Sequence, residues 1–240
     1  MNPSADKSDL TVFENLMHEF DTARVGIRTT ISQLNKATNN GFNPDIQNLN
    51  AHMARLVDQI DILDVLFEFL KIELNPELIR LGTKVELNVH GIFYRACKHY
   101  TARFKEKELK WKLDKVEGFF VKTTSSLSII PLILLDNAIK YSPRKAQIYI
   151  TIDEVGRKIS VESQGPEIKC DEIGHIFERG YRGEYAKLTN SGGQGLGLYI
   201  SKRICDALGF TIKVEQAMTQ YRYGGIPYAT VSFTVCFDVQ

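Results

Sequence analysis

The sequence of 240 residues predicts an α+β protein, in which an N-terminal antiparallel helical hairpin is followed by an α/β sandwich. Up to about residue 70, apolar residues recur at alternating steps of three and four, the spacing of helices that pack along a narrow seam. After Pro76 the pattern changes to short alternating runs mixed with helical stretches. We therefore expect a disordered leader at residues 1–8, the hairpin at 9–75 and the second domain at 76–240.

Composition is that of an ordinary globular protein. The chain has 30 basic and 29 acidic residues, so no bulk charge attracts nucleic acid. Its longest apolar run, Ile129 to Leu135, is far shorter than the roughly 20 residues of a membrane-spanning helix. The first ten residues lack the pattern of a signal peptide, so we expect a cytoplasmic protein without a membrane segment. The scattered cysteines predict reduced thiols rather than a metal site; they are Cys97, Cys170, Cys205 and Cys236.

The hairpin is predicted from two heptad seams joined by a turn at Ala37 to Asn43. The first seam contains Phe13, Leu16, Phe20, Ala23, Ile27, Thr30 and Leu34. The second contains Ile46, Leu49, Met53, Leu56, Ile60, Leu63, Phe67 and Leu70, and its helix should end near Asn75 and Pro76. An isolated hairpin cannot bury two narrow seams, so we predict a homodimer that forms a four-helix bundle. The alternative is a monomer whose hairpin packs on its own second domain.

His18 lies at the outermost point of the first helix if Leu16 and Phe20 belong to the seam. A histidine at that position would be exposed and free to act as a nucleophile. A surface histidine without any role is the plain alternative.

The second domain is predicted as helices on one face of a mixed, mainly antiparallel sheet. Expected strands are 78–81, 109–113, 119–122, 147–153, 158–162, 211–215 and 228–238. Expected helices are 89–104, 126–141, 171–177 and 196–208. Gly180 to Gly193 should form a mobile lid.

The helix that contains LLDNAIKYSP, Leu134 to Pro143, places Asn137, Lys140 and Tyr141 on one face, because positions three and four apart are neighbours. An amide oxygen, an ammonium and an aromatic ring suit a hydrated Mg²⁺, a phosphate chain and a flat base. The alternative is an amphipathic helix with a polar side in water, ended by Pro143.

A glycine-rich run, SGGQGLGLYISKRI, comes sixty residues later and opens a helix. Its glycines are Gly192, Gly193, Gly195 and Gly197. Backbone N–H groups at a helix N-terminus bind anions, so this run predicts a phosphate site. A flexible connector is the alternative.

Together these two motifs resemble the N-box and second glycine box of the ATP-binding domain of sensor histidine kinases, which shares its Bergerat fold with gyrase, the Hsp90 chaperones and MutL. IFERGYRG, Ile176 to Gly183, resembles that family's phenylalanine box, and MHEFDTARVGI resembles its phosphoacceptor box. Asp21, Ala23 and Arg24 depart from the usual RTPL of the phosphoacceptor box. The missing proline removes a kink.

The resemblance implies a role for each matching residue. His18 would accept the γ-phosphoryl group, Glu19 would be its acid–base partner, and Thr22 would assist a phosphatase reaction. Nucleotide contacts would come from Asn137 through Mg²⁺, Lys140 to phosphate, Tyr141 near the base, and the backbone of Gly193, Gly195, Leu196 and Gly197 at the phosphates. A response-regulator receiver domain would bind the hairpin near His18.

The first glycine box departs from the family pattern DxGxG, whose aspartate accepts a hydrogen bond from the adenine amino group. The aligned segment is SQGPEI, with Ser163 in place of the aspartate, Gly165 retained and Glu167 in place of the second glycine. Glu162 cannot replace the aspartate, because adjacent strand residues point to opposite faces. Ile133 stands where the family has its first N-box asparagine.

These departures leave three hypotheses open. The chain is an ATP- and Mg²⁺-dependent histidine kinase with looser base selectivity, or a pseudokinase that keeps the fold but not ATP binding. In the third hypothesis it is a dimeric phosphotransferase that relays phosphate through His18 from a partner's aspartyl phosphate.

Overall fold

The structure is a computed structural model that describes residues 25–33, 56, 59–60, 63–73, 75, 77–189, 193–218 and 221–237. The chain divides into two compact units, residues 1–67 and 68–240. The predicted leader, the turn at 37–43, His18, Glu19 and Thr22 all lie outside the described residues.

The first unit contributes a helical segment at 25–33 and helical residues at 56, 59–60 and from 63 onward. A Cβ added to Gly26 would lie 2.0 Å from the Gln59 side-chain nitrogen, so these two predicted helices approach closely there. Thr30, a predicted seam residue, is buried. The seam residues Ile60 and Phe67 are 50% and 55% exposed on this single chain.

The second unit begins with the last turns of the helix that ends at residue 73, close to the predicted end. α3 (Glu77–Leu81) follows, where we predicted a strand at 78–81, and that prediction is wrong. The reason is local: the Asn75 side chain accepts a hydrogen bond from the Glu77 backbone N–H at 3.0 Å, so it acts as a helix cap.

α4 (Val89–His99) and α5 (Thr101–Glu106) occupy the predicted helix at 89–104, with a break at Tyr100. Their buried residues are Cys97 and those of the predicted apolar face: Val89, Ile92, Phe93, Ala96, Tyr100 and Phe104. A small antiparallel sheet beside them pairs β1 (Val85–Asn88), which was not predicted, with β3 (Phe120–Thr123).

The main sheet has the order β2-β4-β5-β8-β6, and β7 pairs with β8. These strands are β2 (Lys110–Leu113), β4 (Gln147–Asp153), β5 (Lys158–Pro166), β6 (Thr211–Gln216), β7 (Tyr221–Tyr223) and β8 (Ile226–Cys236). β2 and β4 are parallel and the remaining pairs are antiparallel, so the predicted mixed, mainly antiparallel sheet is confirmed.

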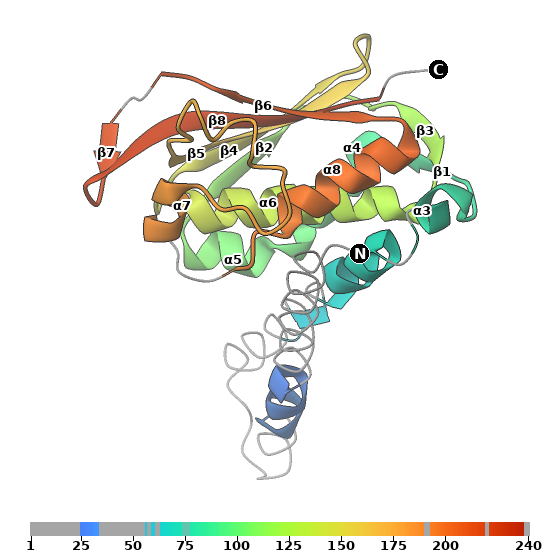
Figure 1. The fold of residues 1–240 in the computed structure, drawn as a ribbon, viewed down its shortest axis with the longest axis horizontal. Helices are drawn as coiled ribbons and strands as arrows, with labels where there is room; N and C mark the ends of the chain where they lie inside the picture. The colour runs from blue at the N-terminus through green and yellow to red at the C-terminus, as the bar shows by residue number, and fades with distance from the viewer. Residues whose placement is uncertain are drawn as a thin grey trace, which may run out of the picture. The chain divides into compact units, whose positions relative to one another are not determined.

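Helices cover one face of this sheet, as predicted (Figure 1). A 3₁₀ turn (Ser125–Ser128) leads into α6 (Ile129–Tyr141), and α8 (Gly197–Leu208) lies beside α6. α6 is buried on most of its surface because it lies between β5 and its neighbours α4 and α8. α8 ends where Gly209 adopts a left-handed backbone (φ 77°), as helices commonly do.

The segment 171–177 is a series of turns, so the predicted helix there is wrong. Most backbone hydrogen bonds in this segment join residues three positions apart. An example is the bond from the His175 N–H to the Glu172 carbonyl at 2.8 Å. Gly174 within the segment disfavours a helix. The Glu172 carboxylate also accepts hydrogen bonds from backbone N–H groups outside the segment. A short helix that was not predicted, α7 (Glu184–Thr189), lies in the predicted lid.

Candidate functional site

α6 brings the predicted site residues to one place. Its apolar side is buried through Ile133, Leu134, Leu135, Ala138 and Ile139, while Asn137, Lys140 and Tyr141 are partly exposed. The helix forms because ten of its thirteen residues are apolar or good helix formers. It ends at Tyr141, because Pro143 disfavours helical backbone at the residue before it, Ser142.

Three glycines from two distant motifs meet this helix. A Cβ on Gly193 would lie 3.0 Å from Lys140 Nζ, and one on Gly197 would lie 3.1 Å from Ile133 Cγ2. A Cβ on Gly165 of β5 would lie 3.8 Å from Tyr141 Cβ. Residues of the first and second glycine boxes therefore lie against the helix that carries the N-box.

Gly195 lets its own backbone approach very closely the backbone just before α7. A Cβ there would lie 2.5 Å from the Tyr181 carbonyl and 2.7 Å from Gly180 backbone carbon, so only glycine fits. Its φ of +70° is a second reason, because this conformation is costly for other residues. Backbone therefore lies directly against backbone where residue 195 passes residues 180 and 181.

Asn137 has a polar atom available for a ligand. Its side-chain Nδ2 is buried and has no hydrogen-bond partner among the described residues. Because the oxygen and nitrogen of an amide are assigned from their partners, either atom can occupy the Nδ2 position. An amide oxygen in that position suits Mg²⁺, which prefers oxygen ligands.

Lys140 and its neighbour Asp136 belong to a small charge network. Asp136 Oδ1 lies 2.7 Å from Arg103 Nη1, and its Oδ2 lies 3.9 Å from Lys140 Nζ. Asp136 therefore bonds mainly to Arg103, and Lys140 remains close to Gly193. The sequence alone does not indicate that Asp136 pairs with Arg103.

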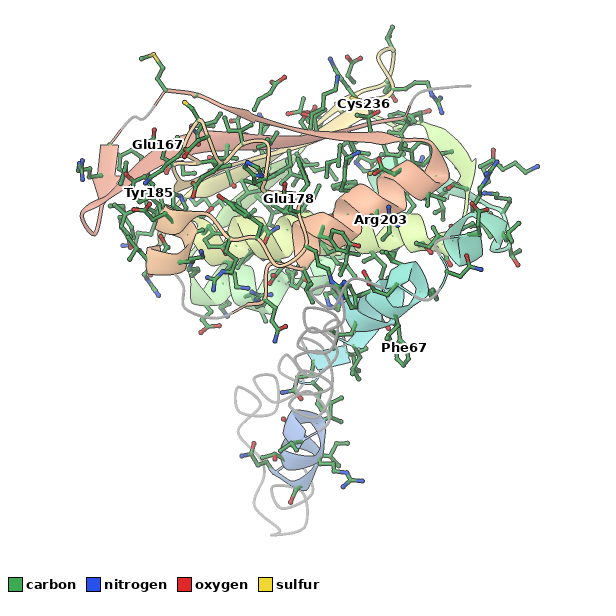
Figure 2. The ribbon with its side chains drawn as sticks, viewed as in Figure 1. Phe67, Glu167, Glu178, Tyr185, Arg203 and Cys236 are labelled. Carbon is green, nitrogen blue, oxygen red and sulfur yellow. The ribbon has the colours of Figure 1, made fainter. Side chains whose placement is uncertain are left out.

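Ser163 lies on the face of β5 that carries Val161 and Gly165, the face toward α6. Glu162 lies on the opposite face, as predicted. So does Gln164, whose side-chain oxygen accepts a hydrogen bond from the Tyr221 hydroxyl at 2.9 Å. Glu167 follows the end of β5, where its N–H donates to the Pro227 carbonyl. Figure 2 shows Glu167 and Tyr185 at the same end of the domain.

A buried acid, Glu172, organises the segment that leads to the predicted lid, and sequence reasoning missed it. Its carboxylate accepts hydrogen bonds from the backbone N–H of Glu184 at 2.8 Å and of Lys169 at 3.1 Å. Lys169 in turn pairs with the Glu184 carboxylate. Burial, followed by the charge of Glu172, raises the pKa of the Tyr181 hydroxyl above its ordinary value. A single carboxylate with distant backbone partners leaves no pattern in a sequence.

The start of the second unit packs against the phenylalanine-box segment and α8. Phe69 is 1% exposed, and its ring centroid lies 6.3 Å from that of Tyr199 and 5.4 Å from the Arg179 guanidinium. Glu73 lies 3.1 Å from Arg179 and accepts a hydrogen bond from the Tyr199 hydroxyl at 3.0 Å. Arg179 and Tyr199 thus join the helix before α3 to two predicted nucleotide motifs.

Some predicted features remain untested by this geometry. His18, Glu19, Thr22 and Gly192 lie outside the described residues, as do Asn190 and Ser191 of the predicted lid. Within the described part of the chain, no cluster of three metal-ligating side chains occurs and no helix is long and apolar enough to cross a membrane.

Comparison with known proteins agrees with the fold of the second unit. Residues 124–239 match the family described as histidine kinase-, DNA gyrase B- and HSP90-like ATPases. The sensor histidine kinase YkoH of Bacillus subtilis is 30% identical over 166 residues, which are 68% of this chain and 34% of YkoH. The histidine protein kinase SaeS of Staphylococcus epidermidis is 25% identical over 221 residues, 89% of this chain and 61% of SaeS.

A solved structure shows the same fold. Full-length ShkA in complex with AMPPNP superposes with a TM-score of 0.54 at 18% identity, covering 92% of this chain and 45% of ShkA. The chain is therefore similar to the core of sensor histidine kinases, and its second unit has the α+β Bergerat fold. It spans between about a third and three fifths of the length of YkoH and SaeS.

Proposed function

Because residues 124–239 form a domain of the histidine kinase-, DNA gyrase B- and HSP90-like ATPase family, we propose that the chain is the core of a two-component signalling kinase. It binds ATP with Mg²⁺ around α6, autophosphorylates on His18 and passes the phosphoryl group to a response-regulator receiver domain. The proposed parts are a leader at 1–8, a phosphoacceptor hairpin at 9–75 and the ATP-binding domain at 76–240.

The observation that carries this proposal is the convergence of Gly165, Gly193 and Gly197 on α6. A Cβ at Gly197 would crowd Ile133 and one at Gly193 would crowd the end of Lys140, whereas a Cβ at Gly165 would lie at ordinary contact distance from Tyr141. Backbone N–H groups at the start of α8 then suit phosphate oxygens. The AMPPNP bound by ShkA, a protein of the same fold, supports the same conclusion.

In this proposal each residue at the site has one task. Asn137 supplies an amide oxygen to Mg²⁺, and the ion when bound neutralises charge on the phosphates. Lys140 contacts phosphate, while Tyr141 and Ser163 lie at the base. The backbone of Gly193, Gly195, Leu196 and Gly197 positions the phosphate chain.

Phosphoryl transfer would occur in line from ATP to a ring nitrogen of His18. The bond from the γ-phosphorus to the bridging oxygen breaks, a phosphorus–nitrogen bond forms, ADP leaves and Glu19 takes the imidazole proton. Such transfers depend mainly on positioning and on charge stabilisation. Thr22, one turn after His18, would assist a separate phosphatase reaction, in which water accepts the phosphoryl group.

The proposed homodimer is supported by the first unit. Val25, Ile31, Ile60 and Phe67 are each 45% or more exposed on the single chain. Pairing two hairpins would bury such residues. Sedimentation of the whole chain should give twice the monomer mass.

The test is autophosphorylation with ATP labelled at the γ-phosphate and Mg²⁺. The wild type should gain an acid-labile, base-stable label that disappears in His18→Gln. The matched control His52→Gln, on the other predicted helix, should keep the label. Labelled His18→Gln, or an unlabelled wild type that binds nucleotide, would contradict the proposal.

A second candidate function is an ATP-independent phosphotransferase or partner-binding pseudokinase. Ser163, Glu167 and Ile133 favour it, because they replace residues that the kinase pattern uses at the nucleotide. A charge-assisted hydrogen bond, the kind lost with the aspartate, contributes about 1.5–3 kcal/mol. Label that reaches His18 from a phosphorylated receiver domain, but not from ATP, would establish this function instead.

A further inference from the structure

The last turn of α6 is held by residues from the end of α5. Lys107 Nζ donates hydrogen bonds to three backbone carbonyls of that turn: Ile139 at 2.7 Å, Lys140 at 3.0 Å and Ser142 at 2.8 Å. The last carbonyls of a helix have no partner within the helix, and a cation there also opposes the negative end of the helix dipole.

The remaining carbonyl of the turn is held from another side. The Tyr228 hydroxyl of β8 donates to the Tyr141 carbonyl at 3.2 Å. One turn earlier, Arg103 of α5 binds Asp136 at 2.7 Å. Lys107 binds the carbonyls on either side of Tyr141, those of Lys140 and Ser142, as well as that of Ile139, so the end of α6 is fixed by α5 and by the sheet.

The chain segments around Lys107 are held in an uncommon backbone conformation. Glu108 and Lys145 both have positive φ, 55° and 65°. Such conformations cost of order 1 kcal/mol or more for residues other than glycine, and persist where the surroundings determine them. The Lys145 N–H donates to the Lys107 carbonyl at 3.2 Å, and Arg144 lies 2.7 Å from the Glu108 carboxylate.

The Lys107 ammonium is partly removed from water. Burial, and then the charges of Arg103 and Arg144, lowers the pKa of Lys107 below its ordinary value. Holding a cation in such surroundings is unfavourable unless hydrogen bonds compensate. The three carbonyls provide that compensation, so their positions and the ammonium depend on one another.

We propose that Lys107 is a positioning residue for the nucleotide site: by capping the last turn of α6 it fixes where Lys140 and Tyr141 project. Lys107 itself touches neither the phosphate nor the base in this account. The inference rests on the nucleotide site proposed above, since that site gives Lys140 and Tyr141 their roles.

The test compares Lys107→Met, Lys107→Arg and the matched control Lys105→Met, an exposed lysine of α5, in the whole chain. Hydrogen exchange of the amides at 138–142 measures the last turn, and calorimetry with AMPPNP and Mg²⁺ measures affinity. Lys107→Met should speed exchange in that turn more than elsewhere and weaken binding about tenfold, the effect of one lost interaction. Lys107→Arg, which keeps several donors, should recover most of the affinity.

A double variant separates positioning from general destabilisation. If Lys107 acts through the residues that it positions, adding Lys107→Met to Tyr141→Ala should weaken binding much less than it weakens the wild type, because coupled residues are not additive. Fully additive effects, or unchanged exchange at 138–142, would overturn the proposal. Should Lys107→Met fail to fold, Lys107→Gln replaces it.

A failure of the proposed function remains distinguishable. If the wild type binds no AMPPNP while folded, the nucleotide site itself is wrong, and Lys107 then has no nucleotide residues to position. If the wild type binds AMPPNP and Lys107→Met binds it equally well, the site stands and the role of Lys107 is wrong.

Discussion

Ser163 is the residue on which the predicted base selectivity depends. It lies on the face of β5 that meets α6, beside Gly165, whose Cβ position is 3.8 Å from Tyr141. A hydroxyl can donate or accept a hydrogen bond, whereas a carboxylate only accepts and does so more strongly.

Replacing Ser163 by aspartate should therefore strengthen the binding of an adenine nucleotide by about 1.5–3 kcal/mol, or one to two powers of ten. Ser163→Asn, similar in shape but neutral, is the matched control and should gain much less. Calorimetry with AMPPNP checks both variants. Equal affinities for the aspartate and asparagine variants would show that this position does not face the base.

The four cysteines should differ strongly in reactivity, because thiol reagents attack the thiolate. Burial raises the pKa of Cys97 to about 12, and burial together with Asp206 raises that of Cys205 to about 12. Cys170 is exposed. A raised pKa leaves almost no thiolate at pH 8.

At pH 8 an alkylating reagent should thus modify Cys170 first and leave Cys97 and Cys205 unmodified until the protein unfolds. Mass mapping of labelled peptides reads the result, and Cys170→Ser is the control that removes the fast phase. Modification of Cys97 at the same rate as Cys170 in the native protein would show that α4 is not packed as described.

Elements with strong periodicity were predictable from the sequence, and elements decided by single side chains were not. α6, α8 and β4 follow their apolar spacing closely. We predicted a strand in place of α3 because its four apolar or charged residues show no helical periodicity. The hydrogen bond from Glu77 to the Asn75 side chain makes this segment a helix instead. The turns at 171–177 resemble a helix in composition, yet Glu172 bonds distant backbone instead.

The residues of the candidate site also fall into those that the sequence indicates and those that it does not. Asn137, Lys140, Tyr141 and the glycines could be predicted because they form contiguous motifs. Arg103, Lys107 and Glu172 could not, because each acts on backbone or a side chain that is far away in the sequence. Such contacts appear only when the elements are packed.

The helix that ends at residue 73 should contribute strongly to the stability of the second unit. Phe69 is 1% exposed, against Tyr199 and Arg179. Phe69→Ala should lower the free energy of unfolding by about 3–5 kcal/mol, the usual cost of removing a buried phenylalanine. Chemical denaturation measures it.

The matched control for this helix is Phe120→Ala, since Phe120 is 56% exposed in β3. Its removal should cost well under half as much. If both substitutions cost the same, the helix before α3 does not pack on the second unit as described.

At the scale of the whole molecule, two units share the proposed task. We propose that the first unit supplies the phosphoacceptor hairpin, and its exposed apolar residues favour pairing with a second copy. The second supplies the Bergerat-type domain, in which three glycines surround the helix that carries Asn137 and Lys140. Nucleotide binding by the second unit is the step on which the kinase proposal depends.

The most direct test of that step is calorimetric titration of the whole chain with AMPPNP and Mg²⁺, beside Lys140→Ala. We predict that the wild type binds AMPPNP with a dissociation constant on the order of micromolar to submillimolar. Lys140→Ala should lose this binding. Lys187→Ala, in α7 and outside the proposed contacts, should bind like the wild type. A folded wild type that gives no heat with millimolar AMPPNP would contradict the kinase proposal.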